Sequence, residues 1–178
     1  MNGFLRDARH VEFVKAVDLS LEFVECLKGS PTFDLVYKVK RDDTMYVLKA
    51  AKRIASHFWF LCFERNALRE AVDVPGITHL VTDYGRVNGD YSAFLKEYAE
   101  GFRFSLDRIP SSYHPDLKSQ LTDTIRALNE NGYFGLDIVD RNLVVSHDLE
   151  TITLIDAFYV SRFPSTDMDI EAVNALFS

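Results

Sequence analysis

Five runs of strand-forming residues lie within the first hundred positions and constrain the fold of this chain more than any other feature. The runs begin near residue 21 and then cover residues 35–40, 45–50, 78–87 and 91–98. Turn residues 41–44 separate the second run from the third, and Asn88-Gly89-Asp90 is a strong hairpin signal between the last two. β-branched and aromatic residues bounded by such turns are typical of antiparallel strands. The pattern therefore predicts a five-stranded antiparallel sheet.

Helical periodicity surrounds and interrupts these strand signals. Apolar residues recur every three or four positions between residues 54 and 72, which predicts one helix inserted after the third strand. A leading helix is expected in the first 18 residues, a longer one over 115–131 and a short one over 167–177, with two short strands at 143–146 and 151–155. We therefore expect an α+β fold with a sheet-rich first half and a mainly helical second half.

Charge and cysteine content exclude several classes of function. The 178 residues carry a formal net charge of −7, which argues against broad nucleic-acid binding or an electrostatic membrane surface. The two cysteines, Cys26 and Cys62, match neither a metal motif nor a disulfide framework. The longest apolar run, residues 58–63, is too short to span a bilayer, and the N-terminus lacks the pattern of a signal peptide. We expect a cytoplasmic protein without a transmembrane segment.

The stretch from Gly132 to Asp156 carries the residues that point to a chemistry. Asp137 lies five residues before Asn142 in a polar loop, and Asn142 runs directly into an apolar strand. After a hairpin, a second apolar strand ends at Asp156. Phosphoryl transfer needs one carboxylate to orient the attacking hydroxyl, and an amide oxygen and a second carboxylate to hold Mg²⁺ against the phosphates. We expect the hairpin to bring Asn142 and Asp156 close enough to share one metal ion.

These residues resemble the catalytic loop and metal-binding segment of the protein-kinase-like superfamily, whose pattern is H-x-D-x-x-x-x-N, then a hairpin, then D-F-G. The resemblance implies that Asp137 is the catalytic carboxylate and that Asn142 and Asp156 bind Mg²⁺. No A-P-E motif follows Asp156, so the chain is most similar to compact atypical kinases such as the RIO, KEOPS-complex and lipopolysaccharide-core kinases. A single domain is implied, with an N-lobe over about residues 1–98 and a reduced C-lobe over 99–178.

The sheet-rich half extends the resemblance. Tyr46-Val47-Leu48-Lys49 is similar to the V-A-I-K strand, which implies that Lys49 reaches the α- and β-phosphates of ATP. Glu64, on the helix that follows, stands where the family keeps the carboxylate partner of that lysine, and Glu70 is a less favoured alternative. A buried ammonium group needs such a partner to keep its proton.

The hinge and the glycine-rich loop of the family also have counterparts. Residues 95–101 resemble the hinge between the lobes, which implies that the backbones of Glu97 and Ala99 bond the adenine. Gly29 matches the first glycine of G-x-G-x-x-G-x-V, and the later glycines are absent. Pro31 removes a backbone donor from this loop, and Asp34 adds negative charge where phosphates are expected.

Four further positions depart from the family pattern. Gly135 replaces the histidine of H-x-D, and Val139 replaces the lysine two residues after the catalytic aspartate. Ala157 and Phe158 follow Asp156 in place of F-G, and Lys96 occupies the position of the usual apolar gatekeeper beside the adenine. These changes predict weak nucleotide binding or slow turnover.

The resemblance implies an ATP- and Mg²⁺-dependent kinase whose acceptor is a hydroxyl on a small molecule, glycan, lipid or protein. Two alternatives stay open. One is a pseudokinase that acts through the apolar helix, where Phe58, Trp59 and Phe63 would contact a second copy or a regulator. The other is an ATPase that a partner protein stimulates.

Overall fold

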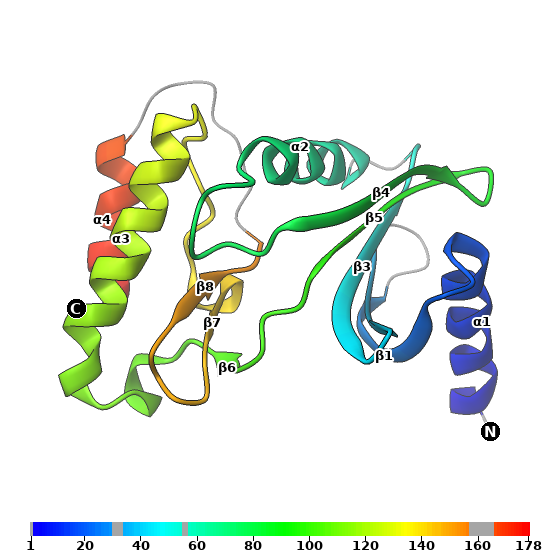
Figure 1. Ribbon diagram of the computed structural model, residues 1–178, viewed down its shortest axis with the longest axis horizontal. Helices are drawn as coiled ribbons and strands as arrows, with labels where there is room; N and C mark the ends of the chain where they lie inside the picture. Colours follow the sequence, from blue (N-terminus) through cyan, green and yellow to red (C-terminus); the bar gives the residue numbers. More distant parts are fainter. Residues whose placement is uncertain (1, 30–33, 55–56, 157–165) are drawn as a thin grey trace. The chain divides into compact units, whose positions relative to one another are not determined.

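The computed structural model describes residues 2–29, 34–54, 57–156 and 166–178, which form an α+β protein of two compact units (Figure 1). The first unit comprises Met1–Arg65 and Leu80–Tyr98, and the second comprises Asn66–His79 and Ala99–Ser178. Membership of residues 66–79 in the second unit is not foreseen from the sequence. Among the described residues, no helix combines the length and apolar character needed to cross a bilayer.

The first unit is built on the predicted sheet, and its five antiparallel strands are confirmed. Their order is β1-β2-β3-β5-β4, so β4 and β5 form a hairpin whose second strand pairs with β3. The strands are β1 (Glu22–Gly29), β2 (Asp34–Arg41), β3 (Thr44–Lys52), β4 (Leu80–Val87) and β5 (Tyr91–Glu97), and the helices are α1 (Asn2–Val17) and α2 (His57–Glu70), the last turn of which belongs to the second unit.

Residues with positive φ make the two predicted turns. Asp42 and Asp43 have φ of 50° and 65° between β2 and β3, and Asn88 and Gly89 have φ of 45° and 75° between β4 and β5. Left-handed backbone at both central positions matches the twist of the flanking antiparallel strands, and Asn, Asp and Gly tolerate it best. The turn chemistry seen in the sequence therefore sets the register of both hairpins.

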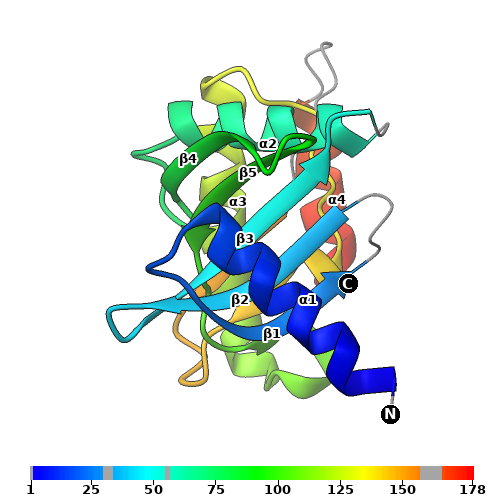
Figure 2. The same cartoon turned by 90° about the vertical axis from the view of Figure 1, so that its right-hand side faces the viewer.

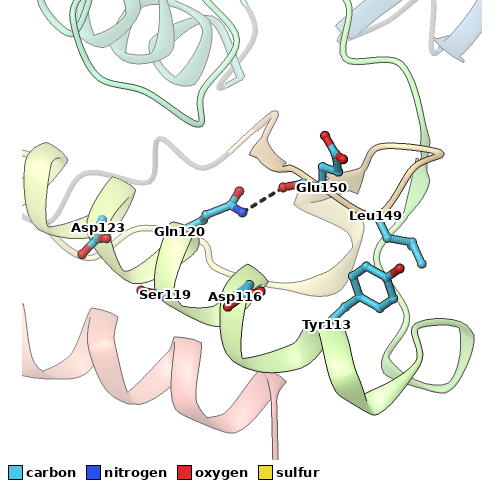
Figure 3. Close-up of a pocket in the computed structure, with 7 residues that line it drawn as sticks. All are labelled: Tyr113, Asp116, Ser119, Gln120, Asp123, Leu149 and Glu150. Atoms are coloured by element: carbon cyan, nitrogen blue, oxygen red, sulfur yellow. Dashed lines mark hydrogen bonds between the residues drawn. The ribbon is translucent and has the colours of Figure 1, made fainter.

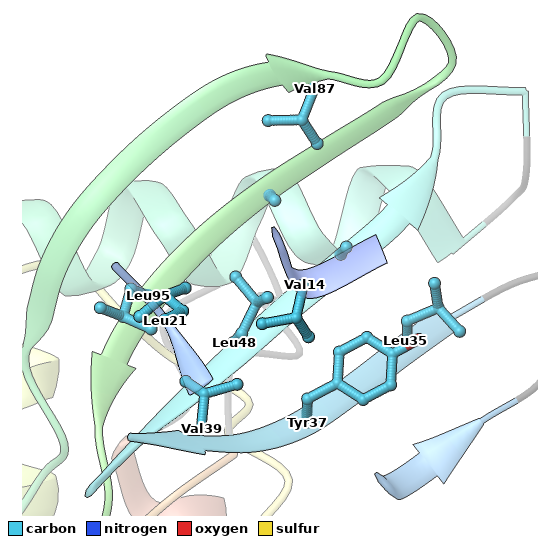
Figure 4. Packing of buried hydrophobic residues seen from close by; sticks show 10 residues of the cluster. Val14, Leu21, Leu35, Tyr37, Val39, Leu48, Val87 and Leu95 are labelled. Carbon is cyan, nitrogen blue, oxygen red and sulfur yellow. The ribbon is translucent and has the colours of Figure 1, made fainter. Parts of the chain in front are cut away.

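Each face of the central strands packs against a different helix. Leu48 of β3 and Leu95 of β5 enter an apolar cluster with Val14 of α1 and with Tyr37 and Val39 of β2 (Figure 4). Figure 2 shows α1 lying across this face of the sheet. Because strand side chains alternate between faces, the residues next to Leu48 and Leu95 point toward α2 instead. Strand β3 is therefore buried on both faces, and residues 47–51 are all buried.

Two polar contacts secure α1 on the sheet. His10 Nδ1 and the Tyr37 hydroxyl share a 2.8 Å hydrogen bond, and Tyr84 donates a 2.7 Å hydrogen bond to Asp18 at the end of the helix. Burial raises the pKa of both tyrosines well above its ordinary value. Their hydroxyls therefore stay protonated, which suits the bond that Tyr84 donates to the Asp18 carboxylate.

The second unit contains a small sheet and two longer helices. Helices α3 and α4 run side by side (Figure 1). The predicted helices and the two predicted short strands are confirmed, whereas the two-residue strand β6 is not foreseen. The elements are β6 (Phe102–Arg103), β7 (Leu143–Val145), β8 (Ile152–Leu154), α3 (His114–Glu130) and α4 (Thr166–Leu176), with 3₁₀ turns at Leu106–Arg108, Ser111–Tyr113 and Asp140–Asn142.

One predicted strand begins later than expected. Residues 78 and 79 do not belong to β4, which starts at Leu80. Instead, Ile77 forms a parallel bridge with Leu154, and Leu154 N donates a 2.8 Å hydrogen bond to Gly76 O. The segment is β-like in composition, but its partner is the edge of β8 in the second unit. Side-chain periodicity does not reveal which edge a strand-like segment joins, and this explains the error.

Gly101 generates a prediction about stability. It precedes β6 with φ of +148°, and a Cβ atom there would lie 2.0 Å from the carbonyl oxygen of Val145, which pairs with Phe102. We expect Gly101→Ala to lower the free energy of unfolding by about 2 kcal/mol or more, measured by urea denaturation, because a backbone atom cannot move aside cheaply.

Gly132→Ala is the matched control. Gly132 also has positive φ, at +85°, but a Cβ atom there would meet open space. This variant should lose only about 1 kcal/mol, the cost of the left-handed conformation. Equal losses for both variants would contradict the assignment of a steric role to Gly101.

Candidate functional site

A cluster of three charged side chains lies on the α2 face of the large sheet. Lys49 Nζ is 2.7 Å from Glu64 Oε2, and Lys96 Nζ is 2.6 Å from Glu64 Oε1. All three side chains are less than 10% exposed. The structure therefore brings together Lys49 and Glu64, which the sequence pattern had picked out, and adds Lys96 to them.

Strand register and helix periodicity explain this cluster. Lys49 of β3 lies directly opposite Phe94 of β5, and Lys96 lies two residues farther along β5, so both lysines project from the same face. On α2, Glu64 is three or four residues from Leu61, Ala67 and Leu68, which are buried. Glu64 thus belongs to the buried stripe of its helix and meets the two lysines there.

Glu70, the alternative partner for Lys49, lies elsewhere. It is exposed and accepts a hydrogen bond from the hydroxyl of Tyr133 in the second unit. Burial and this hydrogen bond raise the pKa of Tyr133. Glu70 lies six residues beyond Glu64, so helix periodicity turns it away from the buried stripe.

The role of Lys96 is missed by sequence reasoning, although a signal exists. The sequence places a lysine directly after Ala93, Phe94 and Leu95 in a strand that is apolar on both faces. A lysine in such a run is either at the end of its strand or paired with a buried carboxylate. The kinase-like pattern assigns Lys96 only to the position of an apolar gatekeeper, because pairing with Glu64 depends on how the helix packs.

The second constellation is the loop around Asp137. Asn142 Nδ2 donates to Asp137 Oδ2 at 3.0 Å and to the Asp137 carbonyl at 2.8 Å, and Arg141 Nη2 donates to the same Oδ2 at 2.9 Å. Leu136 and Ile138 are buried, whereas Asp137 between them is half-exposed. In an extended segment this alternation directs the carboxylate away from the core. The Asp137 Oδ1 atom is not used by any of these bonds.

Asp169 of α4 forms hydrogen bonds with the backbone of this loop. Asp169 is 3% exposed, and its carboxylate accepts hydrogen bonds from the backbone N–H groups of Gly135 and Leu136, at 3.1 and 3.0 Å. Asn129 Nδ2 of α3 donates a third, at 3.0 Å. The loop thus receives a fixed anchor two residues before Asp137, at Gly135, where the family pattern would place a histidine.

Sequence reasoning also missed Asp169. The sequence feature that could have revealed it is an acidic residue on the apolar face of a helix. It lies four residues before Val173, which is fully buried. A carboxylate at such a position must accept hydrogen bonds to remain charged. Its partners are backbone amides more than thirty residues away, and the local pattern cannot reveal them.

The two expected metal ligands lie on adjacent strand ends. Ile155 N donates to Asn142 O at 2.8 Å, so Asp156 follows the residue that pairs with Asn142. Both bonds from the Asn142 amide nitrogen go to oxygens of Asp137, which orients the amide and leaves Oδ1 unused by them. An amide oxygen and the carboxylate of an exposed aspartate suit Mg²⁺, which also takes phosphate and water oxygens. Among the described residues, no three His, Cys, Asp or Glu side chains form a metal cluster by themselves.

The remaining predicted nucleotide contacts are only partly described. Gly29 is the last residue of β1 and is paired with Leu35, but residues 30–33 of the expected phosphate loop lie outside the described residues. Glu97 ends β5 opposite Tyr46, and Ala99, two residues later, is the first residue of the longer segment of the second unit. Ala157 and Phe158, the counterpart of F-G, also lie outside the described residues.

A pocket in the second unit lies away from these residues. It has a volume of about 450 Å³ and lies between α3 and the β7–β8 turn, where Gln120 Nε2 donates to Glu150 O at 2.8 Å (Figure 3). Its lining includes three acidic residues and is mostly exposed: Tyr113, Asp116, Ser119, Gln120, Asp123, Leu149 and Glu150. None of the predicted site residues lines it.

The apolar helix predicted as a contact surface is exposed along one side. Trp59 is 65% exposed, Phe63 is 44% exposed, and Phe58 is half-buried with its ring 5.8 Å from that of Trp59. Cys62 lies between them, and burial raises the pKa of its thiol. One side of this helix is therefore exposed to solvent.

Comparison with protein families and with curated proteins does not extend this description. No family model matches the chain, and no curated relative matches it. The resemblance to kinases therefore depends on the residues and contacts described above.

Asp169 generates a prediction about the loop. Asp169→Asn should lower the free energy of unfolding by about 2 kcal/mol or more, because two backbone N–H donors would lose a charged acceptor and one would face an amide nitrogen. Urea denaturation measures the loss. Asp167→Asn, an exposed change on the same helix, is the control and should change the stability by less than about 0.5 kcal/mol. Similar values for the two variants would contradict the anchoring role.

Proposed function

We propose that this chain is a kinase-like phosphotransferase that binds ATP with Mg²⁺ and transfers the γ-phosphate to a hydroxyl group. The observation that carries the proposal is the buried ion pair between Lys49 and Glu64, 2.7 Å apart. The kinase-like sequence pattern pairs the same two residues, which are fifteen positions apart in the sequence. In this proposal the two units correspond to an N-lobe and a reduced C-lobe.

Lys49 would bind the α- and β-phosphates, and Glu64 would orient it. A carboxylate partner keeps a buried lysine protonated, and a protonated lysine is the form that attracts phosphate. The backbones of Gly29, Glu97 and Ala99 would contribute the further nucleotide contacts that the resemblance implies. The missing loop glycines favour weak binding, because fewer backbone N–H groups can approach the phosphates.

Asn142 and Asp156 would hold Mg²⁺ through an amide oxygen and a carboxylate. Bound there, the ion would neutralise charge on the phosphates. The asparagine would then have two functions, because its nitrogen bonds to Asp137 and its oxygen would bind the ion. This arrangement makes the metal site and the catalytic carboxylate parts of one hydrogen-bonded loop.

Asp137 would orient the acceptor hydroxyl and take its proton as the oxygen–phosphorus bond forms and ADP leaves. Asn142 and Arg141 both bond to Oδ2, so Oδ1 is the atom available to the hydroxyl. Arg141 would supply the positive charge that Val139 lacks at the family's lysine position. Its side chain is 62% exposed and carries a flexible stem, so it could move from Asp137 to a phosphate.

The deciding experiment measures thermal unfolding with ATP, with Mg²⁺ and with both. Together they should raise stability by about 2.7 kcal/mol at a ligand concentration 100 times Kd, because only the folded chain binds. Asp156→Ala should abolish the increase, whereas Asp148→Ala, an exposed change in the neighbouring hairpin turn, should preserve it. Asp137→Asn should preserve the increase and abolish release or transfer of phosphate from labelled ATP. No increase in the unmodified protein would contradict the proposal.

A second candidate function, a binding module acting through α2, is favoured by the exposure of Trp59 and Phe63. These residues and Asn66 project from one side of the helix, and none is charged. Two copies could therefore bring these stripes together without like-charge repulsion. We propose a second copy of this chain as the occupant.

Sedimentation equilibrium tests this candidate. The unmodified protein should show a mass that rises with concentration toward that of a dimer, and Trp59→Glu should remain monomeric. Glu171→Lys, an exposed change on α4, should dimerise like the unmodified protein. A monomer at every concentration would exclude self-association and direct attention to a regulator as the partner.

A further inference from the structure

The two oxygens of the Glu64 carboxylate have different partners. Oε2 accepts from Lys49 at 2.7 Å, and Oε1 accepts from Lys96 at 2.6 Å. The two ammonium groups therefore do not compete for one oxygen. Because Lys49 belongs to β3 and Lys96 to β5, Glu64 attaches α2 to two neighbouring strands at once.

This arrangement lowers the free-energy cost of drawing the Lys49 ammonium group toward another anion. In an ordinary buried pair, removing one partner leaves an uncompensated charge in a medium that solvates it poorly, which is strongly unfavourable. Here Glu64 is 6% exposed and also pairs with Lys96, at 2.6 Å, so its charge would still have a full counter-ion while Lys49 shares its ammonium group with another anion. A second counter-ion therefore makes the Lys49 ammonium easier to transfer to another anion.

We propose that Lys96 is a positioning residue that neutralises Glu64 and holds α2 on the sheet while the Lys49 ammonium engages a phosphate. This inference rests on the proposed function in one respect, since the phosphate is that of the nucleotide. It gives a reason for a lysine at a buried position where the kinase pattern has an apolar residue. It also predicts that attachment of α2 does not depend on Lys49 alone.

The first test is a cycle of unfolding measurements on Lys49→Met, Lys96→Met and the double variant. Each single variant leaves Glu64 with one ammonium group, so each should fold with a modest loss of stability. The double variant leaves the carboxylate with neither lysine, and its loss should exceed the sum of the single losses. Adding Glu64→Gln to the double variant should restore part of the loss, because the stranded charge is removed. Lys38→Met, on β2, is the control for shortening a lysine.

Additive losses would overturn the proposal, and so would failure of either single variant to fold. Failure of the double variant alone, with both single variants folded, would support it. This cycle needs no ligand. It therefore decides whether Lys96 shares the neutralisation of Glu64 even if the chain binds no nucleotide.

The second test measures ATP affinity in the presence of Mg²⁺. Lys96→Met should weaken binding at least about tenfold although Lys49 is intact, because Lys49 is then needed as the counter-ion of Glu64. Lys96→Arg should restore most of the affinity, since a guanidinium group also pairs with a carboxylate. A purely structural lysine would lower stability without changing the affinity of the folded protein. Unchanged affinity in Lys96→Met would overturn the proposal, whereas absence of binding to the unmodified protein would instead refute the proposed function.

Discussion

A carboxylate buried between a helix and a sheet needs a counter-ion, and the packing of α2 in the first unit depends on how Glu64 obtains one. Its partners come from two adjacent strands, so one side chain attaches α2 to both β3 and β5. Burial of these charges costs free energy by itself. These charges contribute specificity, because both ion pairs form only when α2 packs on the correct face of the sheet and the strands pair in the observed register. The cluster thus specifies one packing of α2 on the sheet.

The two faces of the sheet differ in character: one carries the apolar core and the other carries the charged cluster. On the face toward α1, apolar side chains of the helix and of the strands form a continuous core. The hydrogen bonds of His10 and Asp18 attach the helix to the sheet at two points. Toward α2, charged residues are enclosed with Phe94. Alternation along a strand makes this division possible, because Leu48 and Lys49 are neighbours in sequence and yet face opposite layers. A stable core and a charged site can therefore occupy the same strand.

In the second unit, backbone hydrogen bonds position the proposed catalytic loop. Asp169 accepts from two consecutive N–H groups, and Asn142 bonds to both the carbonyl and the carboxylate of Asp137. These bonds fix the loop on both sides of Asp137 without using its Oδ1 atom. A carboxylate held by charge-assisted bonds to backbone is a rigid support. The loop is therefore anchored without a histidine at Gly135, where the kinase-like pattern has one.

The sequence by itself determined the elements and several of their residues. Runs of β-branched and aromatic residues bounded by turn residues such as Asn88 and Gly89 were sufficient for the five strands, and period-3.6 spacing placed Glu64 on a helix. These signals are local, so a linear reading recovers them. The kinase-like function remains a proposal drawn from the same sequence pattern.

Only the tertiary structure decided that Lys96 joins Lys49 on Glu64, that Asp169 supports the loop at Gly135, and that Ile77 pairs with β8. Each of these contacts joins residues more than thirty positions apart, and no local periodicity carries information about such partners. Their identity follows from how faces and edges meet when the chain packs.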